Sequence, residues 1–450
     1  MNLFGRQVIY TDLEEITKDE IVDLITKASS THELNMADIN TLYDYYRGDQ
    51  DIQDRTKTYH TDIMNIITEN RAKEIVDFKT GYLIGSPVTY ASRKADEGTE
   101  NIDVLNDYME SEDKHSKDKA LVDWQNICGT AYRIVLPDDS FEMESDEAPF
   151  EIFTLDPRNA FVIYSSGIGN KPMAGVYRIV DSENTVRYTI YTEEKVFKVA
   201  NGEIEEDADN GIGMIPIVEY PANAARLGAF EPVKDLLDAI NALDSNRMDG
   251  VEQFIQSLVV LTNCDLPEGK TAEDMLQSGL VVLKSFGDNK SDVDILAKEL
   301  NQEQTQVLKE DLYNAVLTIC AMPNRNSGNG DNGVAVVYRD GWSAAETSAQ
   351  GQETAFKLGE KQMLKVVCAI CSDLGALKLK PSLIDIKFTR RNFEGNYVKA
   401  QILTMMLGSD KIDPRLAFIY SGMFSDPQSA YNDSKEYIDK ALQAQASNTQ

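Results

Sequence analysis

Three short motifs contain residues that could bind a phosphate or a metal ion, and the first is Gly269-Lys270-Thr271. This order occurs at the end of a phosphate-binding loop, whose backbone wraps around the phosphates of a nucleotide. Such a loop also needs a glycine five residues before its Gly-Lys pair, and Cys264 occupies that position here. Pro267 removes a backbone N–H that the phosphates would need. We therefore expect no nucleotide site.

The second motif, Asp207-x-Asp209-x-Gly211, resembles the start of a calcium-binding loop, and the third, Cys368-Ala-Ile-Cys371, has the spacing of a zinc-ligand or redox pair. The twelfth position of a calcium loop carries a bidentate carboxylate, and here it is a valine. A structural zinc site needs a second ligand pair, and none has suitable spacing. We predict a solvated acidic turn, two core thiols, and no metal and no cofactor.

The remaining sequence offers no catalytic constellation. The three histidines (32, 60 and 115) are scattered over the N-terminal region. There is no Gly-x-Ser-x-Gly, no His-Glu-x-x-His and no glycine-rich dinucleotide fingerprint. We predict that the chain has no catalytic residues and is not an enzyme.

Charge limits the classes of partner. The 450 residues include 75 Asp and Glu against 44 Lys and Arg, a formal net charge of -31. A protein that grips DNA over most of its surface needs a basic surface, so that class is excluded. Taken alone, such a charge is better explained by solubility through self-repulsion. The five cysteines predict a reducing compartment without disulfides, and the absence of any long apolar stretch predicts no signal peptide and no membrane span.

The elements that must position any site begin with helices. Thr17-x-x-Glu20 has the spacing of a capping box before apolar residues at helical intervals. Within residues 1–129 we predict further helices at 33–46, ending at Gly48, and at 63–83, then a strand at 88–90 and helices at 102–108 and 119–128.

Residues 130–222 change to short runs rich in β-branched and aromatic residues, separated by Gly, Asn, Asp and Pro. Such runs are typical of strands. We predict an antiparallel meander of about five to seven strands, with runs at 132–136, 151–154, 160–164, 175–180, 186–191 and 195–199. The acidic stretch 203–209 is predicted to be an exposed loop.

Two long helices are predicted next, at 231–261 and 302–321. They flank an insert at about 263–298 that contains a short helix at 272–277 and a strand at 279–283. The first long helix carries six acidic residues (231, 235, 238, 244, 249 and 252) against Lys234 and Arg247. This arrangement predicts a stalk with a small α/β tip.

The last third of the chain begins with a Gly- and Asn-rich stretch, 324–333, which cannot form a core and is predicted to be a loop. A long helix at 343–374 and a strand at 384–388, able to rejoin the β-region, follow. Further helices are predicted at 398–407, 414–419 and 430–442, and the last eight residues are predicted to be disordered.

Several longer motifs occur in a fixed order. They are Tyr45-Tyr-Arg-Gly48, Asn65-Ile-Ile-Thr-Glu-Asn70, the run 75–88, Gly213-Met-Ile-Pro-Ile-Val-Glu-Tyr220, the run 244–254, Gly333-Val-Ala-Val-Val-Tyr338 and Ile386-Lys-Phe-Thr-Arg-Arg-Asn392. Their order and spacing over about 35–440 resemble the portal proteins of tailed double-stranded-DNA bacteriophages, in particular those of long-tailed phages of Gram-positive bacteria.

The resemblance implies an α+β chain with the phage portal fold: an α/β wing, long stem helices, a small α/β clip, a tunnel loop and a helical crown. On this sequence the wing would cover 1–230 and 343–395, the stem 231–262 and 300–322, the clip 263–299, the tunnel loop 323–342, and the crown with its tail 396–450.

It also implies a ring, usually of twelve copies, at the capsid vertex of the virion, made in the host cytoplasm, for genome packaging, retention and ejection. The implied partners are further copies of the chain, double-stranded DNA in the channel, the large subunit of the terminase, a head-completion adaptor, the major capsid protein and a scaffolding protein. No membrane is implied.

A channel must let DNA slide, and basic walls would hold it because each neutralised phosphate releases counterions. We therefore name Asp238, Asp244, Asp249 and Glu252 as candidate channel-lining acids. Alternatively, these carboxylates face outward or pair with cations.

Two further sets of residues are expected from the resemblance. Residues of the tunnel loop would contact DNA at a constriction: Arg325, Asn326, Asn329, Asn332, Tyr338, Arg339 and Trp342. Charged residues of the clip would dock the terminase and the adaptor: Glu268, Lys270, Lys284 and Lys290. Alternatively, the loop is only a surface connector.

Two other functions stay open. One is a portal-like connector of a gene-transfer or tail-like particle, with the same fold and a different payload. The other is a cytosolic enzyme with an acidic metal site, which the missing His and Cys clusters argue against.

Overall fold

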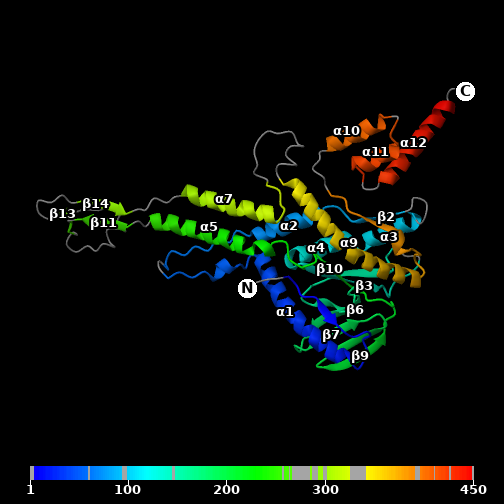
Figure 1. The fold of residues 1–450 in the computed structure, drawn as a ribbon, viewed down its shortest axis with the longest axis horizontal. Helices are drawn as coiled ribbons and strands as arrows, with labels where there is room; N and C mark the ends of the chain where they lie inside the picture. Colours follow the sequence, from blue (N-terminus) through cyan, green and yellow to red (C-terminus); the bar gives the residue numbers. More distant parts are fainter. Residues whose placement is uncertain are drawn as a thin grey trace. The chain divides into compact units, whose positions relative to one another are not determined.

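The chain folds into two compact units, each assembled from segments far apart in sequence. Unit 1 contains residues 1–49, 70–234 and 316–450, and unit 2 contains 50–69 and 235–315. Figure 1 shows the elements of the computed structural model in chain order. The described residues are 5–58, 61–93, 99–143, 147–255, 258–262, 264–265, 284–285, 292–296, 302–324, 341–390, 396–409, 411–424 and 427–447.

Unit 1 begins with strand β1 (Ile9–Thr11) and one long helix, α1 (Ile21–Arg47). The predicted division into two helices is wrong, because the hydroxyls of Ser29 and Ser30 donate to the carbonyl of Thr26 and leave the helix unbroken. The capping-box residues Thr17 and Glu20 do contact each other, but both lie before the first residue of the helix. The Thr17 hydroxyl donates to Glu20 Oε2 at 2.8 Å, and Glu20 is itself the N-cap. As predicted, the helix ends at Gly48, whose φ is 107°.

Helix α2 (Arg71–Leu83) begins eight residues after its predicted start. Asn70 sets this start, because its side-chain oxygen accepts from the N–H of Lys73 at 3.1 Å. The apolar residues at 63–67 that suggested an earlier start lie in an extended segment of unit 2. Strand β2 (Thr89–Ser92) and helices α3 (Thr99–Ser111) and α4 (Lys114–Cys128) confirm the next predictions with somewhat longer bounds.

The β-region contains every predicted strand and two more. Its strands are β3 (Thr130–Pro137), β4 (Phe150–Leu155), β5 (Ala160–Ser165), β6 (Pro172–Val180), β7 (Val186–Tyr191), β8 (Lys195–Ala200), β9 (Glu203–Asp209) and β10 (Ile217–Pro221). The described part of 130–222 therefore has eight strands rather than five to seven. They form two sheets, ordered β10-β3-β4 and β1-β5-β6-β7-β8-β9. The meander is antiparallel as predicted, and β1 adds to it in parallel with β5.

The acidic stretch 203–209 is strand β9, so its prediction as a loop is wrong. It pairs with β8, where Lys198 Nζ meets Glu206 at 2.5 Å and Lys195 Nζ meets Asp209 at 2.8 Å. Opposite charges across a strand pair stabilise it. Because β9 is the last strand of its sheet, its exposed carboxylates also discourage further strand addition.

Helix α9 (Trp342–Asp373), the 3₁₀ turn η3 (Pro381–Leu383) and strand β15 (Ile384–Lys387) confirm the predicted long helix and strand. Strand β15 pairs antiparallel with β2, so the chain returns to the N-terminal region without joining the larger sheets. Cys368 and Cys371 are buried in the core around α9. Burial raises the pKa of Cys371 to about 12, which fits the predicted core thiols.

Unit 1 is held by a buried charge network, which we define as Lys114, Asp118, Arg133 and Glu360 with the hydroxyls of Tyr90 and Tyr220. Asp118 bridges Lys114 at 2.7 Å and Arg133 at 2.6 Å. Glu360 receives Lys114 at 2.8 Å. The two hydroxyls donate to Glu360 at 2.5 and 2.9 Å. The network thereby links α4, β3, α9, β2 and β10.

Burial alone would raise the pKa of Asp118, but Lys114 and Arg133 hold it below its usual range. Two cations balance two carboxylates, so the buried network is neutral overall. That balance is what allows charges to remain inside a core.

Three C-terminal helices confirm the predicted tail: α10 (Asn396–Leu407), α11 (Pro414–Ser421) and α12 (Pro427–Ser447). Phe418 of α11 stacks on Phe424 and meets Tyr431 edge-on. The predicted disorder of the last eight residues is wrong for 443–447, which continue α12, and residues 448–450 lie outside the described chain.

Unit 2 contains most of α5 (Lys234–Ile255) and α7 (Gln302–Ile319), and α5 follows the short turn η2 (Glu231–Val233). The first stem helix was predicted to reach residue 261, but β11 (Leu258–Thr262) pairs with β14 (Asp292–Leu296) instead. Its Val-Val sequence favours a strand. Strands β12 (Cys264–Asp265) and β13 (Lys284–Ser285) also pair. The helix predicted at 272–277 and the strand predicted at 279–283 lie outside the described residues.

Within the part of the chain that is described, no helix has the length and apolar content to cross a membrane. The same residues include no group of three or more His, Cys, Asp or Glu placed to hold a metal. Asp207 and Asp209, the residues of the calcium-like motif, instead form ion pairs with Lys18 and Lys195.

Close packing of α9 on β10 leads to a first prediction. A Cβ on Gly359 would lie 2.7 to 2.9 Å from ring carbons of Tyr220, whose hydroxyl belongs to the buried charge network. We expect Gly359→Ala to lower the free energy of unfolding by about 1–3 kcal/mol through overpacking. Gly351→Ala, on the same helix with nothing within 4 Å, should raise it by about 0.5–1 kcal/mol. Chemical denaturation compares the two, and equal stability would contradict the packing argument.

Candidate functional site

The predicted channel wall, helix α5, is covered along one face by an extended segment of its own unit. The N–H groups of Asn65, Ile67 and Glu69 donate to side chains of α5. Their acceptors are Asp249 Oδ1 at 2.7 Å, Ser245 Oγ at 3.0 Å and Asn241 Oδ1 at 2.8 Å, respectively. We call these three bonds the polar ladder.

The ladder can form because the repeat distance of the extended segment is close to that of helix α5. Every second residue of an extended chain turns its N–H to the same side, which repeats about every 6.7 Å. Every fourth residue of a helix returns to nearly the same face, which repeats about every 6.0 Å. Polar side chains four residues apart on α5 can therefore satisfy alternate N–H groups of the segment, which has no strand partner to do so.

Asp249 anchors one end of the ladder and is also an ionic centre. Its Oδ2 forms ion pairs with Arg55 at 2.8 Å and with Lys57. Burial would raise the pKa of Asp249, but hydrogen bonds from Lys57 and Asn65 and the charge of Arg55 hold it at about 2. Its carboxylate is thus fully committed to the segment 55–65.

A second ion cluster joins α5 to α7. Lys309 of α7 meets Glu69 at 2.6 Å and Asp244 of α5 at 2.8 Å. One turn away, Arg247 donates to Gln306 at 2.8 Å. Burial and the neighbouring Glu69 raise the pKa of Asp244. The two helices are therefore joined by charged and polar contacts.

Glu231, the first residue of the η2 turn before α5, is buried inside unit 1. Glu231 forms an ion pair with Arg6 at 2.7 Å, and both side chains are 1% exposed. Its carboxylate also accepts from the N–H groups of Gly5 and Gly228. A Cβ on Gly5 would lie 2.0 Å from the carbonyl oxygen of Ala225, so this contact of backbone with backbone requires glycine.

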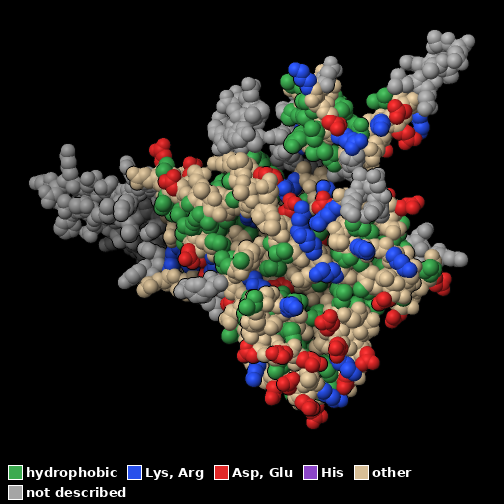
Figure 2. Space-filling model, turned by 45° about the vertical axis from the view of Figure 1, so that its right-hand side comes forward, with side chains coloured by type: hydrophobic (Ala, Val, Ile, Leu, Met, Phe, Trp, Pro, Cys, Tyr) green, Lys and Arg blue, Asp and Glu red, His purple; other side chains and the backbone are tan. Residues whose placement is uncertain are grey.

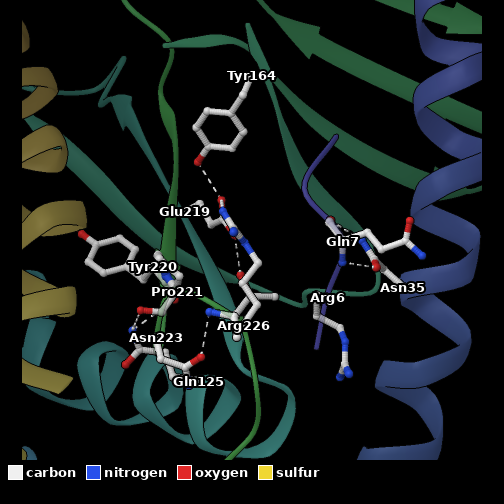
Figure 3. A network of polar contacts seen from close by, with 12 residues as sticks. Arg6, Gln7, Asn35, Gln125, Tyr164, Glu219, Tyr220, Pro221, Asn223 and Arg226 are labelled. Atoms are coloured by element: carbon white, nitrogen blue, oxygen red, sulfur yellow. Dashed lines mark hydrogen bonds and ion pairs between the residues drawn. The ribbon is translucent and has the colours of Figure 1, made fainter. Parts of the chain in front are cut away.

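Figure 3 shows the neighbouring network, in which Tyr164 and Arg226 point towards Glu219. Arg226 grips this carboxylate with two hydrogen bonds of 2.6 and 2.9 Å, and the hydroxyls of Tyr164 and Thr130 donate to it at 2.6 and 2.9 Å. Burial opposes the ionised form of Glu219, yet these donors keep its pKa below the usual range. The chain that enters α5 is thus held in place by two buried carboxylates.

The two ends of the predicted tunnel loop also lie close together in unit 1. A Cβ on Gly341 would be 3.4 Å from the carbonyl oxygen of Met322. Trp342 packs against Phe78 and Tyr82, with 6.1 Å between ring centroids in each case. This tryptophan was predicted to touch DNA, and the structure places it as an anchor at the base of the loop.

The acidic residues predicted to line the channel differ in burial and in their ion-pair partners. Asp244 and Asp249 neutralise cations of their own chain, and Glu231 is buried. Asp238 and Glu252 are half-buried. Their spacing puts both on the stripe of α5 that carries the ladder acceptors, one before and one after them.

Most of the other predicted residues cannot be placed. Lys284 lies on β13. The remaining clip and tunnel-loop candidates lie outside the described residues: Glu268, Lys270, Lys290, Arg325, Asn326, Asn329, Asn332, Tyr338 and Arg339.

The sequence reasoning missed the residues that organise this site, namely Arg55, Lys57 and the 65–69 segment. One signal was available. Asn241, Ser245 and Asp249 form a polar stripe at four-residue spacing on an otherwise amphipathic helix. Such a stripe indicates that something polar covers that face.

A family model and a relative of known name indicate one family. The family model described as "Phage portal protein, SPP1 Gp6-like" matches residues 25–447. The portal protein of Bacillus phage SPP1 is 24% identical over 316 residues, which cover 59% of this chain and 58% of that relative, less than two thirds of its length. Among solved structures, one titled "Neck of empty GTA particle computed with C6 symmetry" has a TM-score of 0.44 and 11% identity, covering 78% of this chain and 90% of that one.

The ionic centre at Asp249 yields a prediction for unit 2. Asp249→Asn leaves Arg55 and Lys57 side by side without a counter-charge, so we expect a loss of about 1–3 kcal/mol in stability at pH 7 and faster proteolysis within 50–69. The pKa of Asp249 in the folded chain, about 2, is below its ordinary 3.8. Its contribution is therefore complete above about pH 4 and is lost as the pH falls towards 2.

The difference between wild type and Asp249→Asn should accordingly shrink over that interval in denaturation experiments. Asp235→Asn, an exposed position on the same helix, serves as the control and should leave both readouts unchanged. A pH-independent difference would contradict the ionic role of Asp249.

Proposed function

The chain belongs to the SPP1 Gp6-like family of phage portal proteins, and we propose that it is the ring-forming subunit of a DNA channel at a capsid vertex. The observation that carries this proposal is the family match over residues 25–447, which includes every element described above except β1 and the first turn of α1. In this role the chain would serve genome packaging, retention and ejection. It would act by position and charge, without a catalytic step.

A ring requires a heterologous interface, in which one face of each copy meets a different face of the next. Such repetition tolerates little variation in the angle between subunits, so each copy must be rigid. The polar ladder and the Lys309 cluster support this requirement, because they fix a loop and two long helices of unit 2 through ionic contacts and directed hydrogen bonds.

The channel wall must avoid holding DNA. Among the described cations of unit 2, Arg55 and Lys57 are paired with Asp249, Lys309 is paired with Asp244 and Glu69, and Arg247 donates to Gln306. We infer that the acidic residues of α5 keep DNA binding by the channel wall weak, mainly by neutralising these cations. Asp238 and Glu252, half-buried beyond the ladder, remain the candidates for direct exposure to the channel.

The loop over 325–340 remains our candidate for contact with DNA. The support is its Gly- and Asn-rich sequence together with the geometry of its base, where Met322 and Gly341 lie together and Trp342 is anchored. A loop that closes on itself at a fixed base can project without disturbing unit 1. Arg325 and Arg339 would supply transient phosphate contacts.

The proposed partners follow from the same assignment. The insert between α5 and α7, with Glu268, Lys270, Lys284 and Lys290, would dock the large terminase subunit during filling and a head-completion adaptor afterwards. Further partners would be the major capsid protein and a scaffolding protein. The chain would be made in the host cytoplasm and carried in the virion.

Electron microscopy of the purified full chain in negative stain tests the proposed function. We expect rings with a central hole, because the subunit should close on itself through heterologous contacts. A compact monomer that shows metal-dependent hydrolysis would overturn the proposal in favour of an enzyme.

The role of the loop has its own test. Replacing residues 324–333 with a Gly-Ser linker keeps Met322, Gly341 and Trp342 and should impair retention of packaged DNA, measured as nuclease-protected genome per particle. As a control, the exposed turn at 167–170 between β5 and β6 is replaced in the same way and should have no effect. Normal packaging and retention by the loop variant would remove the loop from the channel.

A further inference from the structure

One exposed face of unit 1 is basic, in contrast to the rest of this acidic chain. Residues 357–390 contain seven Lys and Arg against three Asp and Glu, whereas the whole chain has 44 against 75. Figure 2 shows Lys and Arg side chains gathered in the middle of one face of the molecule. We define the basic face as five cations: Lys361 and Lys365 of α9, and Arg93, Lys380 and Lys387 around the turn η3, which contacts α9.

Helix α9 presents two of these cations outward. Lys361 and Lys365 are exposed and four residues apart, which spaces them by about 6 Å along one side of the helix. The opposite side packs into the core through residues such as Met363 and Val367. Neither lysine has an ion-pair partner among the described residues.

The β2–β15 pair and the turn before it bring the other three cations together. The N–H of Arg93 donates to the carbonyl of Leu383 at 2.9 Å, and the N–H of Leu383 donates in turn to the carbonyl of Lys380 at 2.9 Å. Lys387 lies on β15 and is 43% exposed. The positions are therefore fixed by a strand pair and a 3₁₀ turn rather than by a loose loop.

Of the acidic groups near this face, Asp373 at the end of α9 is exposed, and the others have partners. Asp385 pairs with Lys387 at 2.7 Å, and the charges of Lys387, Arg93 and Lys357 lower its pKa against the effect of burial. Glu360 is fully buried in the charge network. Glu353 is occupied by Lys357 and Arg390. The net charge presented to solvent by this face is therefore positive.

We propose that the basic face is a second contact for duplex DNA, outside the channel, which binds the phosphate backbone without reading sequence. The inference extends the proposed function, since the DNA handled by the particle supplies the partner. Lys361 and Lys365, which have no ion-pair partner among the described residues, supply the electrostatic footprint of such a contact. Compact ammonium groups on flexible stems suit phosphates at variable positions.

The test uses covalently closed circular duplex DNA, which cannot thread a closed ring and so reports only contacts outside the channel. Binding by the purified full chain is measured over about 50–200 mM salt, the interval in which phosphate contacts are lost. The double variant Lys361→Glu/Lys365→Glu should bind about tenfold more weakly. It should also reduce the slope of log affinity against log salt by about 2, because two phosphate contacts are removed.

The matched control is Lys73→Glu/Lys440→Glu, which makes the same change in net charge at two exposed lysines that are each already paired with a carboxylate four residues away. It should leave the slope unchanged. Equal loss in both variants would overturn the proposal by showing a general charge effect. No binding of the circle by wild type would also overturn it, and capture of poly-glutamate instead would assign the face to an acidic protein.

Negative-stain images of the same preparations separate the two proposals. Rings that do not bind the circular DNA would contradict the proposed second DNA contact and leave the proposed function intact. Absence of rings in wild type would count against the proposed function itself.

Discussion

Unit 1 depends on a neutral group of charges sealed inside its core. Arg133, Asp118 and Glu360 are at most 1% exposed, and each belongs to a different element. Removing one member of such a group leaves an uncompensated buried charge, which costs about 3–5 kcal/mol in typical cases. The network therefore constrains which elements can meet. Helix α9 lies more than 200 residues after α4 in sequence. It can pack only where Glu360 contacts Lys114 and Arg133 and accepts hydrogen bonds from the two tyrosine hydroxyls.

The same way of using charge recurs around α5. Glu231 is buried against Arg6, and Asp249 is surrounded by Arg55, Lys57 and Asn65. In the sequence these carboxylates look like part of an excess of acidic surface residues. In the structure they form ion pairs with specific cations. This pairing has a consequence for the proposed role, because a cation committed to a carboxylate of its own chain is a poor ligand for a passing phosphate.

The sequence was sufficient to predict elements whose own residues determine them. The strands of the β-region and helices α7, α9 and α10 to α12 follow from periodicity and composition. The predictions failed where a distant partner decides. Residues 63–69 have helical spacing, but the stripe on α5 captures their N–H groups in an extended form. Strand β9 is acidic enough to suggest a loop, and only Lys195 and Lys198 across the sheet make it a strand. Of the candidate site, the sequence supplied α5 and its acids but not their partners, since pairing between residues 55 and 249 leaves no local pattern.

The distribution of charge along the chain now separates two kinds of surface. In unit 2 each of Arg55, Lys57 and Lys309 is matched by a carboxylate close by, so duplex DNA in the proposed channel would meet few cations free to replace its counterions. On α9 the neighbouring acids turn inward or pair with other cations, and Lys361 and Lys365 are left exposed. A net charge of -31 hides this difference, because binding depends on the cations left without a partner and not on the total. On the two proposals together, one acidic chain would offer DNA a wall that it slides past and a separate face that holds it.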